Sequence, residues 1–271
     1  MKKKIGLTGS TGSLGKTLRK LNKNCSFIFF KGNISNKRDV LNWIKKNDIT
    51  AIIHLAAIVP IKKVNQNKKK AQKINFIGTK NLVDAVLYRN KIEWFFFAST
   101  SHVYNSSKKK ISENFRTKPI SFYGKTKLLA EKYIEKKFRN TKIKYCIGRI
   151  FSTANKNQKK NYLVPDLIQK LKYAKNKIIL KNLNHYRDFI NMEILSKIIF
   201  VLYQKKYNGI INLGSGKSIY LKDIAKYINR KYQKKLYFID NKRPTTLVAN
   251  NSRLKKIIRF KLPKGIQKII F

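Results

Sequence analysis

Short apolar runs alternate with amphipathic helical patterns from the first residues to about residue 150. In chain order, the apolar runs are KKIGLT, SFIFF, TAIIHLAA, WFFFAS and IKYCIGRI. Near-continuous apolar strands separated by helices are typical of a parallel sheet that is covered on both faces. The pattern therefore predicts an α/β fold with a doubly wound parallel sheet.

The remainder of the chain predicts a second, smaller α/β lobe. NYLVPDLIQKLKYAKN and YLKDIAKYINRKY have helical patterns, whereas GIINLG and KLYFID have strand patterns. We place the main domain at residues 1–155 with 186–214, and the smaller lobe at residues 156–185 with 215–271.

A glycine-rich segment, TGSTGSLGKT, follows the first predicted strand and opens a short helix. Gly9, Gly12 and Gly15 allow the backbone to approach a pyrophosphate, while the helix N-terminus supplies N–H groups and partial positive charge. The segment nearly matches a nucleoside-triphosphate loop, but Ser10 occupies the place of its first glycine. A simple glycine turn is the other alternative. We favour a Rossmann-type dinucleotide-binding domain.

The end of the second predicted strand bears on which dinucleotide would bind. A cofactor with a free ribose 2′-hydroxyl usually meets an Asp or Glu about 20 residues past the glycines. The segment FIFFKGNI has Lys31 and Asn33 there instead. A site without a carboxylate would not repel a 2′-phosphate, and Lys31 could attract one. NADP is therefore as plausible a cofactor as NAD.

A Tyr and a Lys four residues apart can form a redox active site, and this chain has five such pairs. They are Tyr104/Lys108, Tyr123/Lys127, Tyr133/Lys137, Tyr173/Lys177 and Tyr227/Lys231. Ligands bind at the carboxyl edge of a parallel sheet, where each helix begins. Only Tyr123 and Lys127 fall near the start of a predicted helix, which follows Pro119. The strand WFFFAST brings Ser99, Thr100 and Ser101 to the same edge, although such hydroxyls also serve in turns.

The charge is extreme, at +51 from 63 basic and 12 acidic residues. Nucleic acid, anionic membranes and phosphorylated substrates are the partners that a basic protein ordinarily suggests. Lys, Asn and Ile are over-used along the whole chain, however, as an AT-rich coding sequence would produce. A binding patch would concentrate its charge, so we expect no nucleic-acid partner.

Compartment and metal binding can also be judged from the sequence. The longest apolar stretch, AIIHLAAIVPI, is about half of the ~20 residues that span a bilayer. MKKKIGLTGS has no apolar region of the signal-peptide kind. We expect a cytoplasmic protein that does not insert into membranes. Cys25 and Cys146 are the only cysteines, and we expect no metal site.

Together these segments resemble the extended short-chain dehydrogenase/reductase family, which comprises NAD(P)-dependent sugar-nucleotide epimerases, dehydratases and reductases. HLAA, INFIGTKNLVDA, YRDFI, INLGSG and KRPTTLVANNSRLKK resemble family segments at their expected places. The resemblance implies that Thr100 orients the substrate, that Tyr123 is the general acid/base, and that Lys127 lowers its pKa and binds ribose. It also implies a set of residues lining the cofactor besides the glycines: Ser13, Leu14, Asn33, Ile34, Ala56, Asn75 and Phe151.

The resemblance extends to the substrate. Arg187 and Arg243 correspond to arginines that grip the substrate diphosphate, and surface charge is the alternative reading of both. Ser101 and His102 stand where sugar 4,6-dehydratases have an Asp-Glu pair, which argues against dehydration. His102 occupies a position where some keto-sugar enzymes have an acid/base cysteine. It could be a second proton donor at the substrate or simply an exposed loop histidine.

We therefore expect an NAD- or NADP-dependent 4-epimerase or 4-keto-sugar reductase that acts on a nucleotide-diphosphate sugar. The resemblance also implies a homodimer that pairs the helices containing GTKNLVDAVLY and KLLAEKYI. A non-catalytic, nucleotide-sensing or nucleic-acid-binding protein on the same fold is the alternative, and only the charge favours it.

Overall fold

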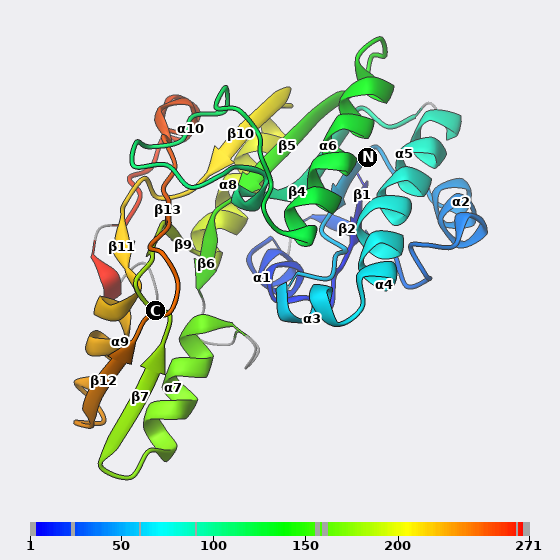
Figure 1. Cartoon of the computed structure of the whole chain (residues 1–271). Coiled ribbons are helices and arrows are strands. Elements are labelled where there is room, and N and C mark those ends of the chain that lie inside the picture. The colour runs from blue at the N-terminus through cyan, green and yellow to red at the C-terminus, as the bar shows by residue number, and fades with distance from the viewer. Residues whose placement is uncertain are drawn as a thin grey trace. The chain divides into compact units, whose positions relative to one another are not determined.

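Two compact units make up the computed structural model shown in Figure 1. The first comprises Met1–Asn105, Arg116–Ile150 and Leu195–Ile211, and the second comprises Ser106–Phe115, Phe151–Ile194 and Asn212–Phe271. The structure describes residues 4–22, 25–59, 61–89, 91–154, 158, 162–263 and 265–267.

The division differs from the expected one, because segments 106–115, 151–154, 186–194 and 212–214 belong to the second unit. Backbone pairing explains the first and third of these differences. The N–H groups of Ser107 and Ile111 donate to the carbonyls of Thr246 and Val248. Tyr186 and Arg187 form a short strand between two strands of the second unit.

A six-stranded sheet forms the centre of the first unit, with the strand order β10-β5-β4-β3-β1-β2. Strands β1 to β5 pair in parallel wherever they are neighbours. The strands are β1 (Lys4–Thr8), β2 (Ser26–Phe29), β3 (Ala51–His54), β4 (Trp94–Thr100), β5 (Lys144–Ile150) and β10 (Gly209–Leu213). This confirms the predicted Rossmann-type sheet.

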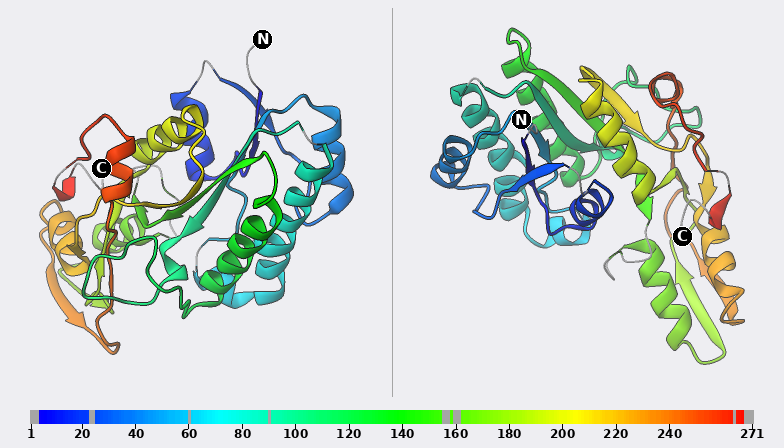
Figure 2. Two further views of the ribbon diagram at one scale, coloured as in Figure 1. Left: turned by 90° about the horizontal axis from the view of Figure 1, so that it is seen from above. Right: turned by 180° about the vertical axis from the view of Figure 1, so that it is seen from behind.

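Helices cover both faces of this sheet, which is why its central strands are apolar throughout. Figure 2 shows α1 and α8 on one face and α2, α5 and α6 on the other. One core cluster packs Val40, Leu82 and Ile134 from the latter three helices against Phe95 and Phe97 of β4. The helical elements are α1 (Ser13–Leu21), α2 (Lys37–Lys46), α3 (Ile61–Gln66), α4 (Lys68–Gln72), η1 (Lys73–Ile77), α5 (Gly78–Arg89), η2 (Ser101–Val103), α6 (Phe122–Phe138) and α8 (Met192–Gln204). No helix in the described ranges is long and apolar enough to cross a bilayer.

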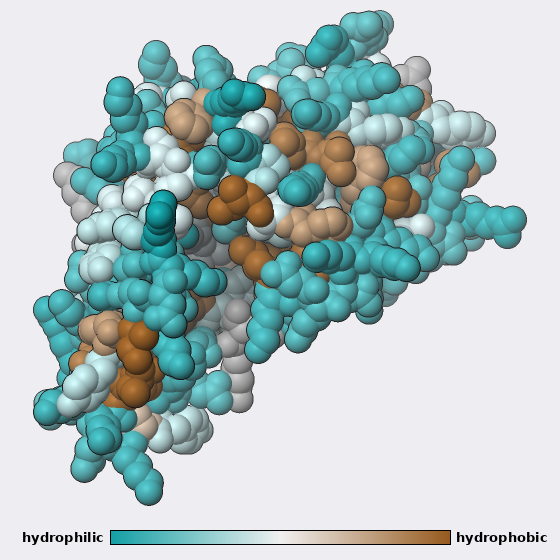
Figure 3. All heavy atoms as spheres, in the orientation of Figure 1, coloured by the Kyte–Doolittle hydropathy of each residue, from teal (hydrophilic) through white to brown (hydrophobic). Residues whose placement is uncertain are grey.

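The second unit has its own core between α7, α9 and a parallel pair of strands, β7 and β12. On the outer face of this pair, Ile179 and Tyr237 are register partners, and both are exposed. Figure 3 shows a mainly hydrophilic face with a compact hydrophobic patch at its lower left, where Figure 1 draws β7 and β12. The elements are β6 (Ser152–Ala154), α7 (Leu163–Tyr173), β7 (Lys177–Lys181), β8 (Tyr186–Arg187), β9 (Phe189–Asn191), β11 (Ile219–Tyr220), α9 (Leu221–Asn229), β12 (Lys235–Ile239), β13 (Thr246–Leu247) and α10 (Ser252–Ile257).

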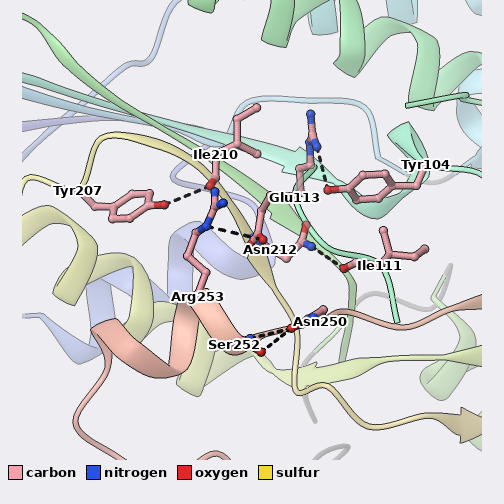
Figure 4. A network of polar contacts seen from close by, with 10 residues as sticks. Tyr104, Ile111, Glu113, Tyr207, Ile210, Asn212, Asn250, Ser252 and Arg253 are labelled. Carbon is pink, nitrogen blue, oxygen red and sulfur yellow. Dashed lines mark hydrogen bonds and ion pairs between the residues drawn. The ribbon is translucent and has the colours of Figure 1, made fainter. Parts of the chain in front are cut away.

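Two polar residues hold the loops of the second unit together. The Asn212 side chain donates to the carbonyl of Ile111 at 2.8 Å, and its N–H donates to Glu113 at 2.9 Å (Figure 4). Asp188 is wholly buried and accepts four hydrogen bonds of 2.7 to 3.1 Å, from the N–H and hydroxyl of Ser215 and from the N–H groups of Gly216 and Ala249. One carboxylate thus joins the segments YRDFI, INLGSG and VANN.

Candidate active site

The glycine loop is shaped by close backbone contacts. Gly9 has a φ of 71°, and a Cβ there would lie 2.7 Å from the Ala56 nitrogen at the end of β3. A Cβ on Gly15 would lie 2.4 Å from the Gly9 carbonyl oxygen. Both positions therefore require glycine, because the backbone itself occupies the space of a side chain.

The loop leads into an α1 N-terminus that is suited to an anion. Its N-cap is Gly12, which has no side chain to accept a hydrogen bond from the first-turn N–H groups, and that turn has no acidic residue. The N–H groups of Ser13 and Leu14 belong to this turn. Uncapped N–H groups and the positive end of the helix dipole together favour a phosphate.

Tyr123 lies in the first turn of α6, as the sequence predicted. The Ser121 side chain caps this helix by accepting a hydrogen bond of 3.0 Å from the Gly124 N–H. A Cβ on Gly124 would lie only 2.1 Å from the His102 carbonyl oxygen, so the helix packs directly on η2. The His102 and Tyr123 rings are 6.0 Å apart, edge to face.

Thr100 begins η2 at the carboxyl end of β4. Its hydroxyl accepts a hydrogen bond from the His102 N–H at 3.2 Å, and the residue is only 4% exposed. Its hydroxyl proton donates to no acceptor in the described chain. Thr100, His102 and Tyr123 are thereby gathered at one edge of the sheet.

Lys127 lies one turn after Tyr123 and is 2% exposed. Its Nζ lies 3.9 Å from the centroid of the Phe97 ring, and it forms no hydrogen bond or ion pair with any described residue. Burial lowers its pKa from 10.5 to about 7, and the nearby Glu131 carboxylate opposes that shift. A buried cation without a hydrogen-bond acceptor is ready to bind a polar ligand.

Two neighbouring charged residues, Glu131 and Arg149, were not singled out from the sequence. Both are buried, on α6 and β5, and they form an ion pair of 2.7 Å. Charged residues are common in this chain, and only the fold shows that these two are internal. The Glu at the fourth position after Lys127 was the one available clue.

A second polar chain connects β1, β3 and the start of α5. Thr79 donates to the Asn75 carbonyl at 2.8 Å, so it accepts from Nε2 of His54 at 2.9 Å. His54 Nδ1 then accepts from the Thr8 hydroxyl at 2.7 Å, which in turn accepts from the Ala56 N–H at 3.2 Å. His54 is held neutral in this chain, and burial, followed by the Lys127 charge, lowers its pKa to about 3.

Asn75 lies in η1, a π-helical segment that precedes α5. Its side chain accepts from the Ile58 N–H at 2.8 Å and donates to the Ile58 carbonyl at 3.0 Å. It also donates to Thr126 at 3.4 Å. Irregular turns of this kind are common at functional sites. Asn75 therefore shapes the loop after β3 rather than presenting its amide to the solvent.

The remaining predicted cofactor residues lie in different settings. Lys31 and Asn33 are exposed after β2, and the Asn33 side chain accepts from Ser35. Ile34 is buried beside Gly78 of α5. Phe151 lies in the second unit, and its N–H donates to the Leu213 carbonyl.

Arg187 and Arg243 also lie in the second unit. The Arg187 guanidinium donates to the Thr245 carbonyl and hydroxyl, each at 2.8 Å, and burial lowers its pKa to about 10. Arg243 is exposed two residues before Thr245. The fold brings the two arginines' segments together, because β8 and β13 pair in parallel.

Sequence comparison identifies the family. The profile of the GDP-mannose 4,6 dehydratase family matches residues 6–263. GDP-6-deoxy-D-talose 4-dehydrogenase from Aggregatibacter actinomycetemcomitans is 30% identical over 232 residues, which are 80% of this chain and 76% of that protein. This chain belongs to the extended short-chain dehydrogenase/reductase family. It is thus an NAD(P)-dependent enzyme of the epimerase, dehydratase and reductase type, as the resemblance implied.

A further relative and two solved structures extend the comparison. UDP-glucose 4-epimerase from Mycoplasma genitalium is 27% identical over 282 residues, covering 93% of this chain and 82% of that protein. The solved Thermus thermophilus UDP-glucose 4-epimerase in complex with NAD has a TM-score of 0.86 at 17% identity, covering 98% of this chain and 96% of that one. A Pseudomonas aeruginosa protein, RMD, complexed with NADPH, has a TM-score of 0.87 at 17% identity, with the same coverage. These two likenesses show the fold.

A nicotinamide dinucleotide fits the residues that are present. The cradle formed by Gly9 and Gly15 leaves no room for a Cβ, and the α1 N-terminus offers uncapped N–H groups to a pyrophosphate. The buried Lys127 ammonium makes no hydrogen bond or ion pair with any described residue, so its N–H groups could serve a ribose hydroxyl. These groups follow the carboxyl ends of parallel strands, where such ligands bind.

Proposed function

We propose that this enzyme transfers a hydride at C4 of a nucleotide-diphosphate sugar, as a 4-epimerase or a 4-keto-sugar reductase. The observation that carries the proposal is Tyr123 in the first turn of α6, one turn from the buried Lys127 and beside η2. Relatives named as a 4-dehydrogenase and a 4-epimerase support chemistry at C4.

Three residues carry the proton chemistry in this proposal. Tyr123 is the general acid/base, and Thr100 orients the sugar oxygen with its hydroxyl. A free tyrosine has a pKa near ~10, so action at neutral pH requires a fall of about 3 units, or roughly 4 kcal/mol. The positive charge of Lys127, one helical turn away, supplies much of that stabilisation. A nicotinamide cofactor, when bound, would supply the acceptor or donor of the hydride.

The two candidate reactions differ in what Tyr123 does. In a 4-epimerase, Tyr123 takes the C4 hydroxyl proton as hydride leaves C4. After the keto sugar has turned, hydride returns to the opposite face of C4 and Tyr123 gives the proton back to the C4 oxygen. In a reductase, it donates a proton once, as the ketone becomes an alcohol. Cofactor that stays bound and oxidised through purification would support the first, and stoichiometric consumption of reduced cofactor would support the second.

Dehydration is not the proposed reaction, although the matching family is described by a dehydratase. Ser101 and His102 follow Thr100 in η2, so that turn offers no carboxylate for eliminating water. We assign His102 to the substrate, since its ring lies 6.0 Å from that of Tyr123.

The diphosphate is assigned to Arg187 and Arg243. An arginine presents a planar pair of donors that matches phosphate oxygens. Arg243 is exposed, and the hydrogen bond from the Arg187 guanidinium to the Thr245 hydroxyl fixes the orientation of Arg187.

We further propose a homodimer and a cytoplasmic location. Helices α5 and α6 would form the dimer interface, and they carry two exposed apolar residues, Tyr88 at 67% and Leu129 at 46%. A reducing compartment suits the two free thiols, Cys25 and Cys146.

A substrate screen with a matched pair of variants tests the proposed function. UDP-, dTDP-, GDP- and CDP-sugars are offered with NAD and NADPH while nicotinamide absorbance and product stereochemistry are followed. Tyr123→Phe should lower turnover at least a thousandfold, because it removes the acid/base hydroxyl. Tyr133→Phe on the same helix should keep turnover, because Tyr133 donates to Asp84 at 2.5 Å instead. Equal activity of the two variants would refute the assignment.

A further inference from the structure

A fixed carboxylate lies behind Lys127 in the first unit. Glu131 follows Lys127 by one turn of α6 and is wholly buried. Its Oε2 accepts from Arg149 Nη2 at 2.7 Å, and both of its oxygens accept from Arg149 Nε at 3.2 Å. The Ser99 hydroxyl donates to Oε1. Two strands thus hold this carboxylate in one position.

The strands that hold Glu131 also carry the proposed site. Ser99 and Arg149 are register partners on β4 and β5, so their side chains point to the same face of the sheet. Ser99 directly precedes Thr100. Arg149 Nη1 also donates to the Tyr104 hydroxyl at 2.8 Å, immediately after η2. If Glu131, Arg149 and Ser99 moved, Thr100, η2 and α6 would therefore move with them.

Among the residues around Lys127, Glu131 is the source of negative charge. The titratable residues near Lys127 are His54, whose pKa the Lys127 charge lowers, His102 and Arg149 on elements that pack against α6, and Tyr123 and Glu131 on α6 itself. Glu131 is the one carboxylic acid among these described residues, and its charge opposes the fall of the Lys127 pKa that burial causes. Helices α3, α4 and α5, which pack against α6, carry lysines and one carboxylate, Asp84. Asp84 already accepts hydrogen bonds from Lys80 and Tyr133. Burial alone favours the neutral amine of Lys127.

We propose that Glu131, locked by Arg149 and Ser99, is a positioning residue that keeps Lys127 cationic and so sets the pH at which Tyr123 works. This rests on the proposed function of Tyr123 and Lys127. Arg149 holds the carboxylate in an ion pair and offsets part of its negative charge. The remaining negative potential of Glu131 still favours the protonated form of Lys127, because buried charges are poorly screened in the low dielectric of the interior.

The test measures Lys127 itself as well as turnover. Lysine side-chain nitrogens are labelled with ¹⁵N, and the Lys127 signal is assigned by its loss in Lys127→Arg. In Glu131→Gln the titration midpoint of Lys127 should fall by at least about one pH unit. The rise of kcat/KM with pH should move upward by a similar amount, so activity falls about tenfold at pH 7 and recovers at higher pH. A merely structural role would not produce that recovery.

Two further variants make the outcome decisive. Glu135→Gln changes a carboxylate one turn further along α6 and should leave the Lys127 midpoint unchanged. Glu131→Gln/Arg149→Met removes both buried charges, so it tests the same shift if the single variant unfolds. An unchanged Lys127 midpoint in either folded Glu131 variant overturns the proposal. The titration needs no substrate, so a wrong assignment of the reaction would not affect it.

Discussion

At the scale of single residues, Lys127 lowers the stability of the fold while it has a proposed role in catalysis. Its ammonium is buried over Phe97, and its pKa is lowered from 10.5 to about 7. Desolvation of the charged form causes that shift. Between these two pH values the unfolded chain binds more protons than the folded chain, so stability rises with pH across that window. At neutral pH the folded enzyme therefore loses stability by burying this charge.

Replacing this lysine should stabilise the protein. We expect Lys127→Met to raise the free energy of unfolding by about 2–4 kcal/mol at pH 7, while abolishing turnover. The gain should shrink by up to ~1.4 kcal/mol per pH unit above 7, as the wild-type lysine loses its proton. Urea unfolding of both proteins between about pH 7 and 9 checks this. A gain that does not depend on pH would contradict the pKa of Lys127.

At the scale of elements, the start of α6 is placed by contact with η2. Ser121 begins the helix, and Gly124 lets its first turn approach the His102 carbonyl. The polar chain through His54 and Thr79 then ties the helix start of α5 to the ends of β1 and β3. The proposed site is therefore built from element ends that are held by backbone contacts.

A methyl group at Gly124 should separate α6 from η2. The Cβ of Gly124→Ala would lie 2.1 Å from the His102 oxygen, so Tyr123 must shift relative to Thr100. We expect turnover to fall about a hundredfold, while the dissociation constant of the cofactor changes by less than about threefold. Lys125→Ala, on the exposed side of the same turn, is the control and should remain fully active. Loss of cofactor binding in Gly124→Ala would show that the contact between α6 and η2 maintains the fold of the whole domain, and not only the position of Tyr123.

At the scale of the whole molecule, dispersed positive charge dominates the surface. The chain has 63 basic and 12 acidic residues, and the face in Figure 3 is largely hydrophilic. So few carboxylates cannot pair with most of the lysines. Charge of one sign repels itself and favours expanded states over the folded one.

Salt should therefore stabilise this enzyme. Raising NaCl from about 0.05 M to about 0.5 M at pH 7 should raise the Tm by several degrees, because screening weakens the repulsion between lysines. Differential scanning calorimetry measures the shift. At the sequence pI of about 10.4 the same salt change should have little effect. A falling Tm at pH 7 would mean that attractive ion pairs outweigh the repulsion.

Local patterns along the sequence were sufficient to predict the parallel sheet, the glycine loop and the place of Tyr123 at the start of α6. Each depends on residues within a few positions of one another: apolar runs, glycine spacing and a helix start. Tyr123 and Tyr133 lie ten positions apart on the one helix α6, so the sequence also distinguished them without any tertiary information.

The tertiary structure alone decided what surrounds those residues. Glu131 meets Arg149 because β4 and β5 pair in one register, and residues 106–115 join the second unit through pairing with 246–250. The low pKa of Lys127 is likewise a product of burial. Pattern within a segment fixes which face of an element is apolar, whereas pairing and desolvation depend on groups that are distant in the chain and close in space.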